Sequence, residues 1–194
     1  TISTPDHTHA NISKAAMEKG IHVYVQKPLT HNVKEARMLT ELARKNKIVT
    51  QMGNQGASNP EQKMIQKWIK DGRIGKVHTV HTWTNRPVWA QGSPMPNPDP
   101  SQKPEGMDWD LWIGPAKNNG YTPGLHAFSW RGYWDYGTGS LGDMGCHIMD
   151  VPIKALGMFE PYSIEASVPR TPYVADYTPA PIYDDSCPPS SYVT

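Results

Sequence analysis

The amino-acid sequence predicts an α/β protein in which part of a parallel sheet is followed by a second α/β domain. Over the first 52 residues, short β-rich runs alternate with helical patterns of 11 to 14 residues, which is typical of parallel strands joined by crossover helices. Residues 77–84 then alternate as a half-exposed antiparallel strand does. A chain of 194 residues with 37% hydrophobic content is long enough for one full domain or two partial ones. We expect one domain over residues 1–56 and the start of another over 57–194.

The first domain is predicted to hold the second half of its sheet. Thr1–His9 is interpreted as a strand end that runs into a turn, and Ala10–Gly20 as a helix. Ile21–Val25 is a short β-rich run. It is followed by an amphipathic helix over Val33–Asn46, which has basic residues at its end, and by a strand over Ile48–Met52.

The second domain is predicted to begin with a helix and a strand. Pro60–Asp71 has proline in its first turn and is followed by Gly72, so it is expected to be helical. Val77–Thr84 is the expected antiparallel strand. Pro87–Pro104 holds six prolines in 18 residues and is predicted to be an irregular loop, a kind of segment that is often functional.

The rest of the second domain is predicted to contain one long helix and one strand. Ser140–Leu156 is expected to form a continuous helix after the glycine-rich turn Gly137-Thr-Gly139. Ser163–Val168 is expected to be a strand. Pro169–Thr194 is rich in Pro, Tyr and Ser and shows no closing element, so we expect this domain to be incomplete at its carboxyl end.

Composition argues against several classes of partner. The formal charge is +1, from 19 basic and 18 acidic residues, so nucleic acid and anionic membranes are not expected partners. No apolar run reaches the roughly 20 residues of a membrane span. The start lacks the features of a signal peptide, but we expect the chain to begin in mid-fold, so the cellular compartment stays open. Cys146 and Cys187 form no C-x-x-C pair, so neither a disulfide scaffold nor a zinc knuckle is indicated.

The aromatic residues leave two readings open. Seven Trp and nine Tyr stand against two Phe. Rings with a polar edge suit flat polar ligands such as sugars, and they equally suit ordinary packing in cores and loops.

The residues that could carry chemistry lie on the long predicted helix and after the first complete strand. Asp143, His147 and Asp150 share a helix face just after a glycine-rich turn. Removing a hydride from a secondary alcohol requires a group that takes the hydroxyl proton, and histidine does so reversibly. Lys27 follows a strand at its carboxyl end, where open α/β sheets place their ligands, and its ammonium would stabilise an alkoxide. Taken singly, these residues also have simpler explanations. Lys27 could be an ordinary solvated lysine, and the spacing of Asp143 and His147 could be accidental.

The order of four motifs resembles one enzyme family. The motifs are Thr4-Pro-Asp-His-Thr-His9, Gly20-Ile-His-Val-Tyr-Val-Gln-Lys-Pro-Leu29, Gly53-Asn-Gln55 and Gly139-Ser-Leu-Gly-Asp-Met-Gly-Cys-His-Ile-Met-Asp150. Together, through about residue 168, they are similar to the glucose-fructose oxidoreductase, inositol dehydrogenase and rhizopine-catabolism (Gfo/Idh/MocA) family. The resemblance implies a Rossmann-like parallel sheet joined to an α/β domain with a large, mainly antiparallel open sheet. It also implies NAD or NADP as cofactor and sugars or polyols as substrates.

The resemblance assigns catalytic roles to three residues. Lys27 matches the catalytic lysine of the family's E-K-P motif, Asp143 the substrate-binding aspartate and His147 the histidine that exchanges the hydroxyl proton. The glutamate of that motif is replaced by Gln26, which keeps a hydrogen-bonding group and removes a charge.

Further residues are assigned to binding. Thr4, Pro5 and His9 match the loop beside the nicotinamide, with Asn54 as their neighbour, and Lys27 is assigned to the cofactor site as well. His9 has the alternative role of capping the following helix. Trp130 and Arg131 precede the active-site helix and are expected to line the sugar pocket or, alternatively, to stack on each other.

The family's G-x-G-x-x-G loop, which binds the pyrophosphate, is absent from these 194 residues. We therefore expect the chain to be an N-terminally truncated fragment that binds NAD or NADP weakly on its own, and whether the fragment itself is active or inactive stays open. The full-length protein is expected to be a homo-oligomer that takes a small-molecule sugar or polyol.

Three alternatives to a sugar or polyol dehydrogenase stay open. One is NAD-assisted cleavage of a glycoside through transient sugar oxidation, with His126 or Tyr133 as the additional acid or base. Another is a non-catalytic binding module. The last is a metal site, whose ligands would be His7, His9, Asp143 and His147.

Overall fold

The computed structural model describes residues 1–168 and 181–194. Its N-terminal unit is built on β1 (Val23–Gln26) and β2 (Thr50–Gly53), with α1 (Asp6–Glu18) and α2 (Val33–Asn46). The two strands are parallel, and Ile2 adds an isolated parallel bridge to Val25. The short parallel sheet predicted from the alternation of strands and helices is thereby confirmed.

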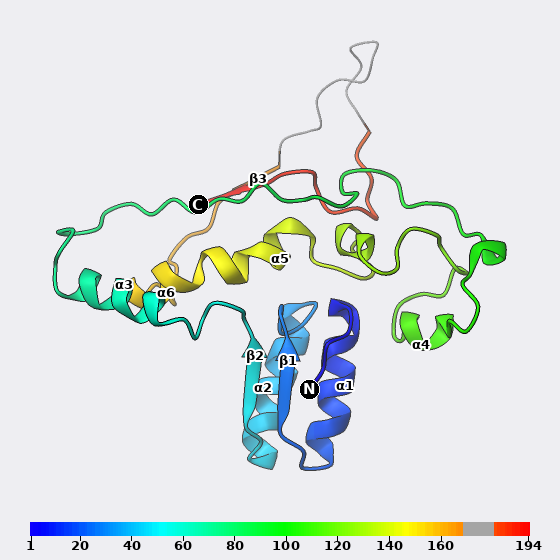
Figure 1. The fold of residues 1–194 in the computed structure, drawn as a ribbon, viewed down its shortest axis with the longest axis horizontal. Coiled ribbons are helices and arrows are strands. Elements are labelled where there is room, and N and C mark those ends of the chain that lie inside the picture. Colours follow the sequence, from blue (N-terminus) through cyan, green and yellow to red (C-terminus); the bar gives the residue numbers. More distant parts are fainter. Residues whose placement is uncertain (169–180) are drawn as a thin grey trace, which may run out of the picture.

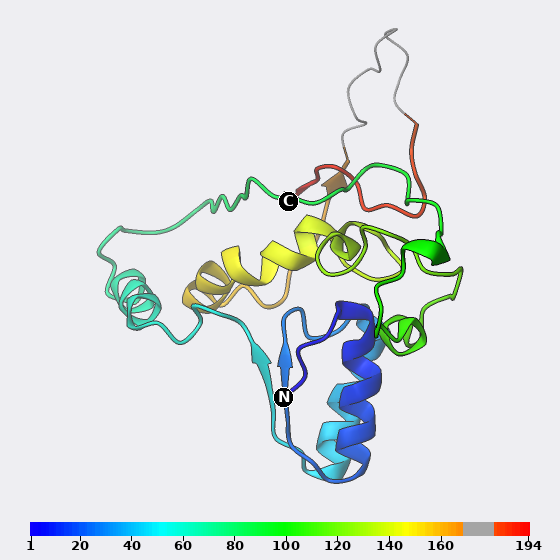
Figure 2. The same cartoon turned by 45° about the vertical axis from the view of Figure 1, so that its right-hand side comes forward.

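The two helices cover one face of this sheet (Figures 1 and 2). Val23 and Val25 of β1 face the helices and are buried, whereas Tyr24 between them is half exposed on the other face. The core between sheet and helices consists of Ile2, Ala10, Met17, Val23, Val25 and Leu39.

Local signals set the ends of the two helices. α2 has the predicted bounds because Asn32 and Glu35 form a reciprocal capping box at its start. α1 begins at Asp6 instead of the predicted Ala10, since Pro5 precedes the helix in an extended conformation and the Asp6 carboxylate suits the first turn. His7 and His9 therefore lie inside a helix and not in a turn.

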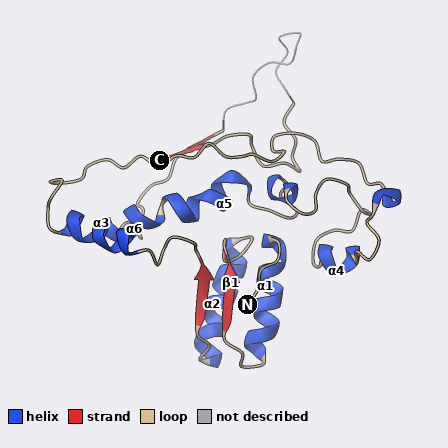
Figure 3. Ribbon diagram, viewed as in Figure 1, coloured by secondary structure: helices blue, strands red, loops and turns tan. Residues whose placement is uncertain are grey.

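The other described residues, 54–168 and 181–194, are mainly irregular (Figure 3). Their elements are α3 (Pro60–Lys70), the 3₁₀ turn η1 (Pro100–Gln102), α4 (Trp109–Ile113), the 3₁₀ turn η2 (Ser129–Gly132), α5 (Gly139–Ile148), α6 (Asp150–Leu156), β3 (Ala166–Ser167) and β4 (Tyr192–Val193). A second core forms around the rings of Trp109, Tyr121, Trp130, Tyr133 and Tyr136. Pro87–Pro104 is irregular, as predicted, apart from η1.

The expected long helix over Ser140–Leu156 is two helices. α5 ends at Ile148 and α6 starts at Asp150. Pro152 has no N–H to give to the carbonyl of Ile148, and its ring would clash with that carbonyl in a continuous helix. Asp150 is therefore not on a shared helix with Asp143 and His147, and it pairs with Lys154 of α6 at 2.8 Å.

The large open sheet is absent from the described residues. The sheets there are the pair β1–β2 and the antiparallel pair β3–β4, so the strand expected over Ser163–Val168 is reduced to two residues. The carboxyl-terminal segment does contribute an element, β4, although none was expected; the part of that segment over 169–180 lies outside the described residues.

Residues 77–84 are extended but form no strand, because no described segment supplies a hydrogen-bonding neighbour. Within the described ranges, no helix has both the length and the apolar character needed to cross a bilayer.

Helix α5 lies across the carboxyl ends of β1 and β2 (Figure 1). The residues that follow these two strands both bond to it, Lys27 through Asp143 and Asn54 through Cys146. The edge of the sheet where α/β proteins place their ligands therefore faces the helix that carries Asp143 and His147.

Candidate functional site

Lys27 and Asp143 form the centre of the candidate site. The Lys27 ammonium lies 2.7 Å from Asp143 Oδ1 and also donates to the Asp143 backbone carbonyl at 2.9 Å. The side chains are only 13% and 12% exposed, so the pair is shielded from water and weakly screened. The structure thus brings together two residues that stand 116 positions apart in the sequence.

Arg131 gives Asp143 a second cationic partner. Its Nε lies 3.3 Å from the same Oδ1 that Lys27 contacts. The guanidinium lies 4.3 Å from the Trp130 ring centroid and 4.8 Å from that of Phe128, so it is held by stacking on both rings. The predicted stacking of Trp130 and Arg131 is therefore observed. Trp130 is buried, so a role for it in lining a sugar pocket stays a prediction.

His147 lies one helical turn beyond Asp143 on α5 and is partly buried. Residues four apart share a helix face, which places the imidazole on the same face as Asp143. Among the described residues, no hydrogen bond of the His147 ring is found.

Asn54 connects the end of β2 to α5. Its Nδ2 donates to the Cys146 carbonyl at 2.7 Å, a group near the end of α5 that lacks an intrahelical partner because the helix stops at Ile148. Its Oδ1 is buried and has no hydrogen-bond partner among the described residues. A buried acceptor without a partner is costly unless a ligand or water supplies a donor.

The loop before α1 is tied to the Lys27 turn by His9. The His9 ring is fully buried, with Nδ1 2.7 Å from the Pro28 carbonyl oxygen and Nε2 2.8 Å from that of Thr4. The His9 ring thus joins the loop before α1 to the turn after β1. His9 lies inside α1, whose N-cap is Pro5, so the alternative role of His9 as a helix cap is wrong. Thr4 is exposed and Pro5 partly exposed, and both are accessible at the surface above His9.

Gln26 contacts the backbone of Lys27. Its Oε1 accepts the Lys27 backbone N–H at 3.0 Å and the Gln55 side-chain amide at 3.1 Å. A neutral amide at this position therefore keeps a hydrogen bond to the turn that presents the lysine.

The sequence pattern did not single out Asp6, which is buried near the centre of the site. Asp6 Oδ2 accepts the Thr138 hydroxyl at 3.0 Å. Burial is the largest cause that raises the Asp6 pKa from 3.8 to about 6; the negative charge of Asp143 raises it further, while the Thr138 hydrogen bond and the charges of His9 and Arg131 lower it. Its position in Thr4-Pro-Asp-His-Thr-His9 was the available signal, but the pattern carried no information on burial.

Replacing Asp6 with asparagine should change how stability depends on pH. Because the pKa of Asp6 is higher in the folded chain, its contribution to stability is fully present below 3.8 and is lost as pH rises through about 6. Asp6→Asn keeps an acceptor for Thr138 and removes the charge. The free energy of unfolding of the variant, relative to that of the wild type, should therefore increase by about 2–3 kcal/mol as the pH rises from 4 to 8. Urea unfolding at several pH values measures this difference. Asp71→Asn, at an exposed ion pair, is the control; a difference between wild type and Asp6→Asn that is constant over this pH range would contradict the expectation.

The described residues contradict one alternative drawn from the sequence, the metal site, and one of the two residues suggested for glycoside cleavage. The described residues contain no group of three or more His, Cys, Asp or Glu side chains placed to hold a metal ion, so His7, His9, Asp143 and His147 are not a metal site there. Tyr133 is buried and its hydroxyl donates to the Pro94 carbonyl at 3.3 Å, which removes it as an additional acid or base. His126 is exposed beside Trp112.

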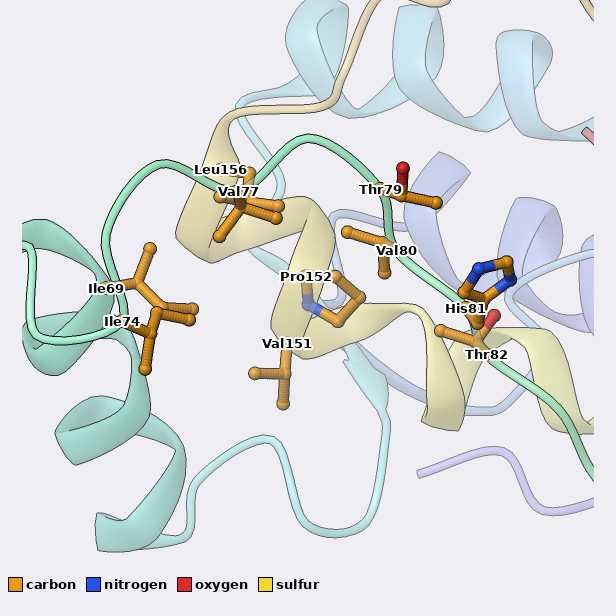
Figure 4. Close-up of a pocket in the computed structure, with 10 residues that line it drawn as sticks. All are labelled: Ile69, Ile74, Val77, Thr79, Val80, His81, Thr82, Val151, Pro152 and Leu156. Carbon is orange, nitrogen blue, oxygen red and sulfur yellow. The ribbon is translucent and has the colours of Figure 1, made fainter.

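An apolar cavity of about 280 Å³ lies away from this site, between α3, α6 and the irregular segment 74–82 (Figure 4). Val77 and Val80 both line it, although an alternating strand would put them on opposite faces. None of Lys27, Asp143 and His147 lines this cavity.

Comparisons with known proteins agree with the motifs. Residues 58–174 match the family model described as "Oxidoreductase family, C-terminal alpha/beta domain", and residues 1–54 match "Oxidoreductase family, NAD-binding Rossmann fold". The first match alone covers more than half of the chain. The chain therefore belongs to the Gfo/Idh/MocA oxidoreductase family.

Individual relatives are distant. A levoglucosan dehydrogenase of Pseudarthrobacter phenanthrenivorans is 26% identical over 159 residues, which are 81% of this chain and 33% of that protein. An NADP⁺-dependent scyllo-inositol 2-dehydrogenase of Bacillus subtilis is 23% identical over 167 residues, 86% of this chain and 36% of that protein. The chain thus spans about a third of the length of these curated relatives.

A solved structure supports the fold. The inositol dehydrogenase homologue of Azotobacter vinelandii, crystallised with NADH and myo-inositol, aligns with a TM-score of 0.58 at 23% identity, over 98% of this chain and 39% of that one.

Proposed function

We propose that this chain carries the substrate-side residues of an NAD(P)-dependent oxidoreductase that moves a hydride between the cofactor and a hydroxyl-bearing carbon of a sugar or polyol. The observation that carries the proposal is the 2.7 Å pair of Lys27 and Asp143, which joins the end of β1 to α5. A shielded ion pair at the ligand-binding edge of a parallel sheet is an arrangement suited to holding a hydroxylated substrate.

Each of the three residues has a separate task. The Lys27 ammonium stabilises negative charge on the reacting oxygen, because it is a fixed cation in a site shielded from water. His147 accepts the hydroxyl proton as the alcohol becomes a carbonyl, and it returns the proton in the reverse direction. Asp143 uses Oδ1 for Lys27 and Arg131, which leaves Oδ2 to accept a hydrogen bond from a neighbouring substrate hydroxyl.

The residues around β1 and β2 fit a nicotinamide. Asn54 Oδ1 is a buried acceptor without a partner among the described residues, and a carboxamide N–H would satisfy it. Thr4, Pro5 and Lys27 would complete this side of the cofactor site, with His9 supporting them. When bound, the nicotinamide supplies the hydride acceptor, so an alcohol and the oxidised cofactor give a carbonyl compound, the reduced cofactor and a proton.

The named relatives point to cyclic polyols as the substrate class, since levoglucosan and scyllo-inositol are both polyhydroxylated rings. The chain should therefore be incubated with inositols, anhydrosugars and aldoses in the presence of NAD⁺ or NADP⁺. We expect one equivalent of reduced cofactor for each carbonyl formed, at saturating concentrations of the cofactor. Loss of a glycoside without net reduced cofactor would contradict the proposal and favour redox-assisted cleavage.

A further inference from the structure

The three residues directly before α5 are each held by the N-terminal unit. The Tyr136 carbonyl oxygen lies 3.2 Å from Nδ1 of His7, and the Gly137 carbonyl oxygen lies 3.0 Å from Nε2 of His31. The hydroxyl of Thr138 donates to Asp6 at 3.0 Å. The position at which α5 starts is therefore set by residues more than 100 positions earlier in the chain.

Thr138 occupies the N-cap position of α5 without acting as a cap. An N-cap threonine ordinarily accepts a backbone N–H of the first turn, but no such side-chain bond exists here. Its side chain also lies so close to Gly142 that a Cβ at that position would collide with it. The Thr138 side chain is thus enclosed between the Asp6 carboxylate and the first turn of α5.

The same geometry accounts for the glycine-rich turn Gly137-Thr-Gly139. A Cβ on Gly137 would collide with the Arg131 backbone, and Gly139 has a φ of +62°, which side-chain-bearing residues rarely adopt. These glycines allow the segment to pass closely between Arg131 and the N-terminal unit. In this turn they permit close packing of the chain.

We propose that Asp6 is a positioning residue that acts through Thr138: it fixes the start of α5 and so holds Asp143 within bonding distance of Lys27. Asp143 lies five residues after Thr138, so a shift or rotation of the first turn moves its carboxylate away from the ammonium. The anchoring itself stands on geometry alone, and only its importance for catalysis rests on the proposed function.

Asp6 is suited to this task because it is almost completely buried. Its side chain lies in the first turn of α1, and its exposed fraction is 4%. A buried acceptor that loses its donor is costly, so Asp6 keeps the Thr138 hydroxyl in place more firmly than water or an exposed side chain would.

The test measures how strongly the ion pair with Asp143 protects Lys27 from chemical labelling. Because no turnover is needed, the result can be interpreted even if the proposed enzymatic function is wrong. The folded chain is briefly acylated with an amine reagent, and the labelling of Lys27 is compared with that of exposed Lys34 by peptide mass spectrometry. In the wild type, Lys27 should be protected. Thr138→Val removes the hydroxyl at nearly constant shape, and we expect it to raise the Lys27 to Lys34 ratio about five-fold, the effect of one ordinary hydrogen bond on an opening equilibrium.

Three further variants make the outcome decisive. Thr138→Ser keeps the hydroxyl and should restore protection, and Thr40→Val, which removes an exposed hydroxyl from α2, should leave the ratio unchanged. If Thr138→Val does not fold, the double variant Asp6→Leu with Thr138→Val decides instead, because it leaves no buried carboxylate without a partner. The proposal would be overturned if a folded variant without the hydroxyl protected Lys27 as well as the wild type does. It would also be overturned if Thr138→Ser lost as much protection as Thr138→Val.

Discussion

Replacing Lys27 with methionine is expected to lower kcat/KM for polyol oxidation by about 10²–10³-fold, the usual cost of removing one group that stabilises developing charge on oxygen. Methionine keeps the length and the apolar part of the side chain and removes only the charged donor. Asp143 keeps Arg131 as a partner, so the fold should survive. The measurement is initial rates of reduced-cofactor formation over a range of polyol concentrations.

The matched control is Lys34→Met, which removes an exposed lysine from α2. It should leave the rate unchanged. If Lys27→Met kept kcat/KM within about three-fold of the wild type while remaining folded, then Lys27 would not stabilise the reacting oxygen.

Replacing His147 with asparagine is expected to lower kcat by about 10²–10⁴-fold, the range that a positioned acid or base contributes. Asparagine still forms hydrogen bonds but cannot take up the hydroxyl proton. The His147 ring makes no hydrogen bond among the described residues, so stability should change little. Single-turnover rates of the wild type and the variant would isolate this step from cofactor release.

His78→Asn, in the extended segment after α3, is the control for removing an exposed imidazole. If His147→Asn had the same kcat as His78→Asn, the proton of the substrate hydroxyl would have to leave by a route that does not include His147. Residual activity confined to high pH would instead indicate that hydroxide replaces the missing base.

Local sequence signals predicted the N-terminal unit well. The bounds of α2 were predicted because Asn32, Glu35 and the basic residues of the last turn all act within the helix itself. The strand β1 and the following Lys27 were likewise placed by a short β-rich run that ends at a proline. The order of motifs assigned Lys27 and Asp143 to one site, but their ion pair was not predicted, since no local pattern relates two residues 116 positions apart.

The errors have physical causes of two kinds. The break between α5 and α6 follows from Pro152, a signal that was present in the sequence and outweighed by the helical pattern around it. The alternation in residues 77–84 is compatible with a strand, but a strand also requires a neighbour, and periodicity cannot supply one.

The burial of Asp6 and His9 was not predictable from the sequence. Both contact groups that are distant along the chain: Thr138 for Asp6 and the Pro28 carbonyl for His9. Tertiary packing therefore decides that Asp6 is a buried carboxylate with a raised pKa and that His9 supports a loop.

The most direct test of the central claim follows the hydride itself. The protein is incubated with NAD⁺ or NADP⁺ and an inositol that carries deuterium on its ring carbons, and the reduced cofactor is analysed by mass spectrometry. The arrangement of Lys27, Asp143 and His147 predicts that deuterium appears on the nicotinamide ring in step with formation of the inosose, and that the Lys27→Met variant loses both together. Carbonyl product without deuterium on the cofactor would contradict the account, because the hydrogen would then have left the substrate by a different route.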